Sequence, residues 1–166
     1  MRKILNIIGA ISLVVTSTTT LVSCNTPQEK EYTPEELKHL KKENQIDTTN
    51  ETIKNNLEWI TSQEKPFNPT GDYKYYIIIW RGDENDNWTI KKYKNTYEEV
   101  GRIDTSYSGA ALYRNSDDLV ANKTREHATW ITDNGTYFKA VYRWSLDIIP
   151  PDLIIDDYGN IKVKED

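Results

Sequence analysis

The segment from Asp72 to Trp80, DYKYYIIIW, constrains the fold of this chain more than any other. Aromatic and β-branched residues dominate it, and such residues favour an extended strand. Residues 81–87, RGDENDN, are typical of a loop, and the strand pattern resumes over residues 88–94, WTIKKYK. Two such runs around a polar loop predict an antiparallel β-hairpin. Side chains alternate along a strand, so two faces are expected: Tyr73, Tyr75 and Ile77 on one, and Tyr76, Ile78 and Trp80 on the other.

Two helices are predicted before this hairpin. Thr33, Pro34 and Glu36 combine an N-cap, a proline in the first turn and the glutamate of a capping box, which together start a helix. This helix is expected to end near Asn44. A second helix is expected from about Asn50, with three apolar residues at helical spacing before two prolines: Ile53, Leu57 and Ile60, then Pro66 and Pro69.

Further strands are predicted after the first hairpin. Asn134-Gly135 is the preferred pair for a two-residue type I′ turn, so residues 127–144 are expected to form a second hairpin. Its register would place Ile131 opposite Phe138, Thr129 opposite Ala140 and His127 opposite Tyr142. We expect a weaker strand at residues 109–114, a helical turn or loop at 96–104, and a last small hairpin at 152–163.

Helices followed by strands indicate the α+β class. We therefore predict one domain over residues 34–166, in which two N-terminal helices pack on one face of an antiparallel, hairpin-rich sheet. The chain holds five Trp and eleven Tyr but only two Phe. Tyr and Trp are enriched in recognition surfaces. If helices cover one face only, some of these rings would meet solvent or a partner.

The N-terminal residues have the pattern of a secretory signal peptide. Arg2 and Lys3 precede an apolar run from Ile7 to Val15, and the chain's only cysteine, Cys24, follows a small residue. A basic start, a short apolar region and small residues before a cleavage point define such signals. The run is shorter than the about 20 apolar residues of a membrane-spanning helix.

Leu21, Val22 and Ser23, together with Cys24, resemble the lipobox of bacterial lipoproteins. The first 25 residues resemble the leader of mollicute lipoproteins of the spiroplasma type, from wall-less bacteria with one membrane. The resemblance implies cleavage of residues 1–23, a diacylglyceryl group on Cys24, and palmitate-type acyl chains inserted in the outer face of the plasma membrane. Residues 24–33 would then be the lipidated cysteine and a flexible tether. The alternative is an unpaired structural cysteine behind an ordinary signal peptide.

Charge and cysteine content exclude several classes of function. The net charge is −5, and cleavage would remove two of the 21 basic residues against 26 acidic ones, leaving about −7. Such a chain is unsuited to nonspecific nucleic-acid binding or to a polybasic grip on anionic lipid, because both need clustered Lys and Arg. A lone cysteine excludes internal disulfides and cysteine-rich zinc sites.

Two motifs fall on the loop of the first hairpin. Arg81, Gly82 and Asp83 resemble the integrin-binding tripeptide of adhesion proteins, although Gly-Asp is also ordinary turn chemistry. Residues 83–87 alternate Asp and Asn in the manner of a cation loop. An EF-hand loop needs Gly and Glu at the places that Trp88 and Lys94 occupy. We name Tyr73, Tyr75 and Trp80 as further candidate binding residues.

Catalytic signals are weak. His127 with Glu126 or Asp133 would form an acid–base pair, and Asp117-Asp118 and Asp156-Asp157 are paired acids that suit solvated turns better than a shared site. No nucleophile elbow, HExxH sequence or phosphate loop occurs.

We predict a membrane-anchored extracellular lipoprotein without cofactor or metal, acting as a non-enzymatic recognition or adhesion module. Its partners would be the bilayer, through acylated Cys24, and an extracellular protein or glycan rather than nucleic acid. The alternative is a small surface hydrolase or nuclease without a recognisable motif. A two-lobed solute-binding protein is disfavoured by length.

Overall fold

The computed structural model describes residues 31–62, 64–96, 100–123 and 126–164. The predicted leader, Cys24 and most of the predicted tether lie outside these residues. Two helices and ten strands occur in the described part. They are α1 (Pro34–Glu43), α2 (Glu51–Asn56), β1 (Leu57–Ile60), β2 (Tyr75–Trp80), β3 (Thr89–Lys94), β4 (Val100–Thr105), β5 (Ala111–Asn115), β6 (Asp118–Lys123), β7 (Glu126–Thr129), β8 (Phe138–Trp144), β9 (Leu153–Ile155) and β10 (Ile161–Val163).

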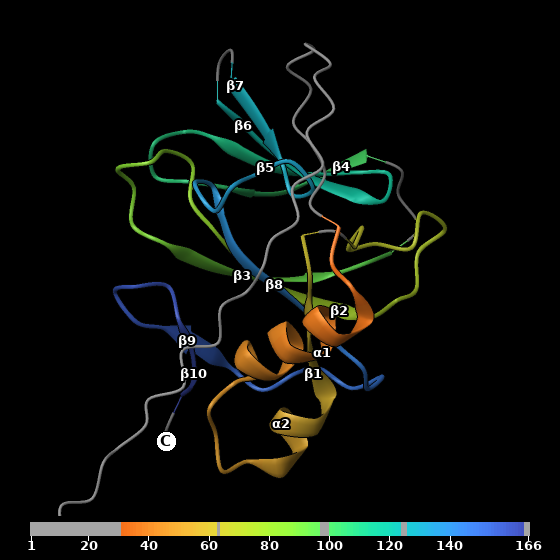
Figure 1. Ribbon diagram of the computed structural model, residues 1–166. Helices are drawn as coiled ribbons and strands as arrows, with labels where there is room; N and C mark the ends of the chain where they lie inside the picture. Colours follow the sequence, from red (N-terminus) through yellow and green to blue (C-terminus); the bar gives the residue numbers. More distant parts are fainter. Residues whose placement is uncertain (1–30, 63, 97–99, 124–125, 165–166) are drawn as a thin grey trace, which may run out of the picture.

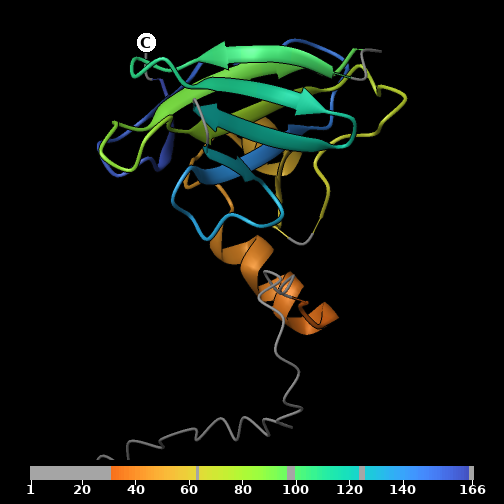
Figure 2. The same ribbon diagram turned by 90° about the horizontal axis from the view of Figure 1, so that it is seen from above.

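The strands form three antiparallel sheets arranged in layers (Figure 1). Sheet A has the order β1-β8-β2-β3, sheet B has the order β4-β5-β6-β7, and β9 and β10 form a two-stranded sheet. Figure 2 shows sheet B lying over sheet A, with α1 projecting beyond the strands. Sheet A is therefore the middle layer, between sheet B and a layer made of α2 and the β9–β10 hairpin.

Two apolar clusters fill the space on either side of sheet A. The first lies between sheets A and B, where Tyr76, Ile78 and Trp80 of β2 meet Leu112 of β5 and Leu119 of β6. The second lies on the opposite face of sheet A and holds Ile77, Ile79, Tyr142, Trp144, Ile46, Ile53 and Ile161. Both faces of β2 are buried, and this explains why its sequence is almost continuously apolar.

The predicted α+β arrangement is wrong. The protein is mostly β, and sheet B covers the face of sheet A that was expected to be open. Helix α1 has no buried residue, and α2 is a six-residue helix that buries only Ile53. Helices therefore provide only part of one covering layer, because β10 supplies Ile161 to the same cluster.

The predicted starts of both helices are confirmed, but only the first helix ends where it was predicted to end. Thr33 caps α1 and forms the capping box with Glu36, and Asn44 is its C-cap. Asn50 caps α2, which ends at Asn56, before the predicted end. Leu57 and Ile60 instead belong to β1 and pair with β8. They lie in the two different clusters, one on each face of sheet A, so both are buried without helical geometry.

Two of the predicted hairpins are confirmed. Strands β2 and β3 pair from Tyr75↔Lys94 to Trp80↔Thr89, and the two predicted faces of β2 pack in different clusters. The last hairpin forms as β9–β10. The weak strand at 109–114 is present as β5. The expected turn or loop at 96–104 is wrong over residues 100–104, which belong to β4, and residues 97–99 of this prediction lie outside the described residues.

The predicted hairpin around Asn134-Gly135 is wrong. Strand β7 pairs with β6 in sheet B, and β8 pairs with β1 and β2 in sheet A, so the chain crosses between sheets at residues 130–137. The carboxylate of Asp133 accepts hydrogen bonds from the backbone N–H of Gly135 at 2.9 Å and of Phe138 at 3.0 Å. The Trp130 indole N–H bonds to Thr61 O, and these contacts hold a wider loop.

A buried arginine joins the two sheets. Arg114 of β5 has no exposed surface. Its guanidinium donates to four backbone carbonyls at 2.9–3.2 Å, those of Ser116, Thr96, Asn68 and Pro69. These carbonyls belong to the turn after β5, the end of β3 and the loop before β2. One side chain therefore satisfies carbonyl acceptors from three connections.

We expect Arg114→Lys to lower the free energy of unfolding by about 2–4 kcal/mol, because one ammonium group cannot reach four divergent carbonyls and buried acceptors lose their donors. Urea unfolding measures this loss. The matched control is Arg102→Lys on the exposed face of sheet B, where a change within about 0.5 kcal/mol is expected. Equal effects of the two substitutions would contradict the role given to Arg114.

Candidate functional site

The arginine of the Arg81-Gly82-Asp83 tripeptide is bound within the protein. The Arg81 side chain donates through Nε to Thr136 O at 2.5 Å, and its backbone N–H donates to Tyr137 O at 2.9 Å. Its guanidinium lies 4.4 Å from the ring centroid of Trp88. A cation stacked on an indole and bonded to a carbonyl holds one conformation. The tripeptide therefore fastens the β2–β3 loop to the crossing between the sheets.

The glycine of the tripeptide is buried against the β4–β5 loop. A Cβ at Gly82 would lie 2.7 Å from the Cβ of Ala110 and would also collide with Ser106. The Asp83 carboxylate accepts from the backbone N–H of Asn85 at 3.1 Å, as in an ordinary Asx turn. Among the described residues, no group of three or more His, Cys, Asp or Glu side chains is placed to hold a metal ion.

The named aromatic residues do not form one surface. Tyr73 is 61% exposed and has a positive φ of 56° just before β2. Tyr75 packs against the apolar cluster on the face of sheet A that points away from sheet B. Trp80 is fully buried in the other cluster, between sheets A and B. Burial in two opposite directions accounts for most of the Tyr and Trp content.

His127, the Asp117-Asp118 pair and the Asp156-Asp157 pair lie on different elements. His127 is exposed on β7 and pairs with Asn122 rather than facing Tyr142. Asp117 forms an ion pair with Lys65 at 2.7 Å. The neighbouring Asp118 is half-buried, and burial raises its pKa to about 6, with Asp117 adding to the rise and the Leu119 N–H opposing it. Asp156 serves the β9–β10 turn, where it accepts from the backbone N–H groups of Tyr158 and Asn160.

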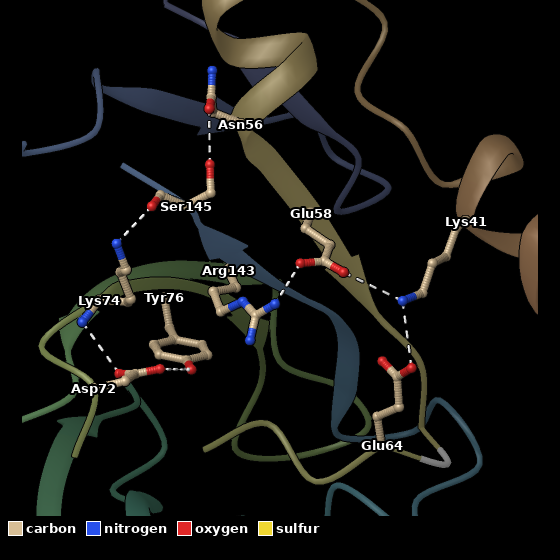
Figure 3. A network of polar contacts seen from close by, with 9 residues as sticks. All are labelled: Lys41, Asn56, Glu58, Glu64, Asp72, Lys74, Tyr76, Arg143 and Ser145. Atoms are coloured by element: carbon tan, nitrogen blue, oxygen red, sulfur yellow. Dashed lines mark hydrogen bonds and ion pairs between the residues drawn. The ribbon is translucent and has the colours of Figure 1, made fainter. Parts of the chain in front are cut away.

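A network of charged groups fastens α1 to the edge of sheet A (Figure 3). Glu58 of β1 accepts from Arg143 of β8 at 2.6 Å and from Lys41 of α1 at 3.3 Å, and Lys41 also lies 3.4 Å from Glu64. Burial raises the pKa of Glu58, but the bonds and charges of Arg143 and Lys41 outweigh it and lower this pKa. The network is the main polar attachment of a helix without buried side chains.

The other half of this network is structural too. Tyr76 donates its hydroxyl to Asp72 at 2.7 Å, and Asp72 also accepts from Asn95 Nδ2 at 2.9 Å. Burial raises the pKa of the Tyr76 hydroxyl, and the Asp72 carboxylate raises it further. Tyr76 therefore stays protonated as a donor. Its carboxylate acceptor is shared with a buried asparagine, so the group orders the start of β2.

The best candidate binding site is a groove beside β10. It has a volume of about 850 Å³, which is within the range of ligand-binding sites. One wall is the β9–β10 hairpin, and the other is the connection between the two helices, residues 47–49. A smaller hollow of about 210 Å³ continues past Ile161 to Tyr142 and Lys139 of sheet A, and it shares Asp47, Asn160 and Ile161 with the groove. We call these two hollows together the β10 groove.

The β10 groove carries charges of both signs. Lys162 is 59% exposed and lies 3.5 Å from the Asp156 carboxylate, and Lys164 is exposed beyond the end of β10. Hydrogen bonds from the backbone and side chain of Asn160 outweigh desolvation and lower the pKa of Asp156. Asp47 is exposed on the opposite wall. The groove therefore has two lysines and Asp156 on one side, and the polar loop with Asp47 on the other.

Sequence reasoning predicted the β9–β10 hairpin and missed the β10 groove. The groove depends on the approach of residues 47–49 to β10, which are more than a hundred positions away in the chain. Local propensity contains no signal for such a contact. An apolar residue at Ile46, outside both predicted helices, was the one available hint, because this side chain is buried in the cluster with Ile161.

Comparison with protein-family models, with curated proteins and with solved structures finds no match. Within the described ranges, no helix has the length and apolar character needed to cross a membrane.

The raised pKa of Asp118 leads to a prediction of pH-dependent stability. A carboxyl whose pKa is higher in the folded state than its ordinary 3.8 destabilises the fold when it is ionised. We expect Asp118→Asn to raise the free energy of unfolding at pH 7 by about 1 kcal/mol, since solvent screens a half-buried carboxylate. The gain should fade as pH falls from about 6 toward 4. Urea unfolding at pH 7 and pH 4 measures it, and an equal gain at both would contradict this origin.

The burial of Gly82 leads to a second prediction. Gly82→Ala should lower the free energy of unfolding by about 1–3 kcal/mol, because the added methyl group collides with Ser106 and Ala110. Thermal unfolding measures the change. Glu84→Ala, an exposed substitution in the same loop, is the control and should have little effect. A fully stable Gly82→Ala variant would show that the loop is not held against β4 and β5.

Proposed function

We propose that this protein is a lipid-anchored lipoprotein on the outer face of the plasma membrane, and that its β domain is a non-enzymatic recognition module. The observation that carries the recognition role is the β10 groove, which is bordered by an unpaired strand edge and a polar loop. Strand edges recognise partners through backbone groups and need no catalytic side chains.

The proposed attachment to the membrane rests on the sequence. Leu21-Val22-Ser23-Cys24 resembles a lipobox, and a thiol at a new N-terminus is the nucleophile that thioether formation requires. Each buried CH₂ group of an acyl chain contributes about 0.8 kcal/mol, so two chains give stable attachment. A domain on such an anchor meets extracellular molecules.

The anchor is tested by incorporation of labelled palmitate in cells that express the full chain, combined with trypsin treatment of intact cells. We expect label and surface cleavage in the wild type, and loss of label in Cys24→Ser because the acyl acceptor is removed. Ser23→Ala keeps a small residue before the cysteine and should retain the label. An unlabelled wild-type chain would contradict the proposed anchor.

A further inference from the structure

We infer that the β10 groove binds an extended peptide segment of a partner protein, which adds as a strand to the free edge of β10. This inference rests on the proposed function, because it names the ligand class of the recognition module. The hydrogen-bonding register of β10, the wall opposite it and the charges along the strand support this ligand class.

The register of the β9–β10 hairpin leaves two residues facing away from β9. The backbone N–H of Asp156 donates to Asn160 O at 3.0 Å, and that of Lys164 donates to Asp152 O at 3.4 Å. Hydrogen-bonded and non-bonded pairs alternate in an antiparallel ladder. The pair Lys162↔Ile154 is therefore bonded, and the N–H and C=O groups of Ile161 and Val163 point outward from the free edge.

The opposite wall also presents backbone groups without partners. The backbone N–H and C=O groups of residues 46–49 form no hydrogen bond with any other described residue. The wall is nevertheless held in place, since Ile46 is buried and Asn50 accepts from the Ile53 N–H at 3.2 Å as the cap of α2. An extended segment between these walls would find donors and acceptors on the free edge of β10.

The side chains around the edge define the chemistry of the peptide. In an added strand, the side chains opposite Ile161 and Val163 would lie on the same face as these two residues. That face adjoins the apolar cluster that holds Ile161. A residue opposite Lys162 would lie on the outer face, beside the exposed Ile154 and the Lys162 ammonium group, which is 59% exposed although it lies 3.5 Å from the Asp156 carboxylate. The groove therefore fits an apolar–acidic–apolar triplet in extended conformation.

The test uses the full chain in mild detergent and a phage-displayed library of random nonapeptides as the probe. We expect enriched peptides to share the apolar–acidic–apolar pattern. Val163→Pro should weaken their binding about tenfold, because proline removes an outward N–H and places its ring on the edge. Val163→Ala keeps the N–H and should change Kd less than about threefold.

A second variant and a second measurement do not depend on the proline. Lys162→Glu should replace the preference for an acidic central residue by one for a basic residue. In hydrogen exchange, a bound peptide should slow the amides of Ile161 and Val163, whereas the Lys162 amide should exchange slowly even without peptide.

Three outcomes would overturn the inference: no peptide enriched over a control protein, equal binding to Val163→Pro and wild type, or protection confined to another strand. These measurements do not depend on the acyl group. Failed peptide binding with intact palmitate labelling would therefore remove the ligand class and leave the anchor, and failed labelling with intact peptide binding would do the reverse.

Discussion

Strand β2 has no face that meets water, and the layers of the protein follow from this constraint. Tyr76, Ile78 and Trp80 point toward sheet B, while Ile77 and Ile79 point the opposite way. Burying each large apolar side chain contributes about 1.5–3 kcal/mol, so both faces need a cover. Sheet B supplies the first. The second is assembled from segments near both ends of the described chain, and the β10 groove is the place where those segments lie side by side without pairing.

Arg114 shows how the polar connections around this apolar interior are satisfied. Burying a guanidinium is costly unless its donors are bonded, and here the acceptors are the carbonyls of loops that turn over the end of the sandwich. The carbonyls supply the acceptors that the buried guanidinium needs, and the guanidinium supplies donors for these carbonyls. The result connects β5 of sheet B to the ends of β2 and β3 of sheet A through one side chain. The Phe67 ring, 5.8 Å from the guanidinium carbon, closes the apolar side of the site.

The sequence predicted those elements whose signals are local. The capping box at Thr33 and the turn residues around Gly159 act over a few positions, and both predictions are confirmed. Leu57 and Ile60 show the limit, because strand pairing with β8 overrides helical spacing. At Asn134-Gly135, the carboxylate of the preceding Asp133 accepts a hydrogen bond from the Gly135 N–H, which a tight turn would leave without a partner. Sheet B was predicted only in part: β5 was expected as a weaker strand, whereas β4 was expected as a turn or loop, because Gly101 and the charged residues Arg102 and Asp104 interrupt its apolar pattern.

For the candidate site, the residues that the sequence made conspicuous take part in packing, and the β10 groove was not predicted. Arg81 of the Arg81-Gly82-Asp83 tripeptide stacks on Trp88. The Trp88 ring also packs against the β9–β10 hairpin, since a Cβ at Gly159 would lie 2.8 Å from it. The proposed binding in the groove instead uses backbone N–H and C=O groups, which every residue type except proline has, so the sequence does not indicate them. Its short strand, Ile161–Val163, reads as an ordinary edge protected by a lysine. Only the register with β9 shows which of its amides point outward.

The position of α1 relates the groove to the proposed anchor. The tether would join α1 at Thr33, and the connection that forms the groove wall begins just after Asn44, at the other end of the helix. A ten-residue helix spans about 15 Å, and residues 25–33 reach at most ~30 Å when extended. Headgroups occupy only about 5–8 Å on each side of a bilayer. In the proposed anchored state the tether is therefore long enough to place the groove beyond the headgroup layer, where the proposed peptide ligands would be segments of other surface proteins.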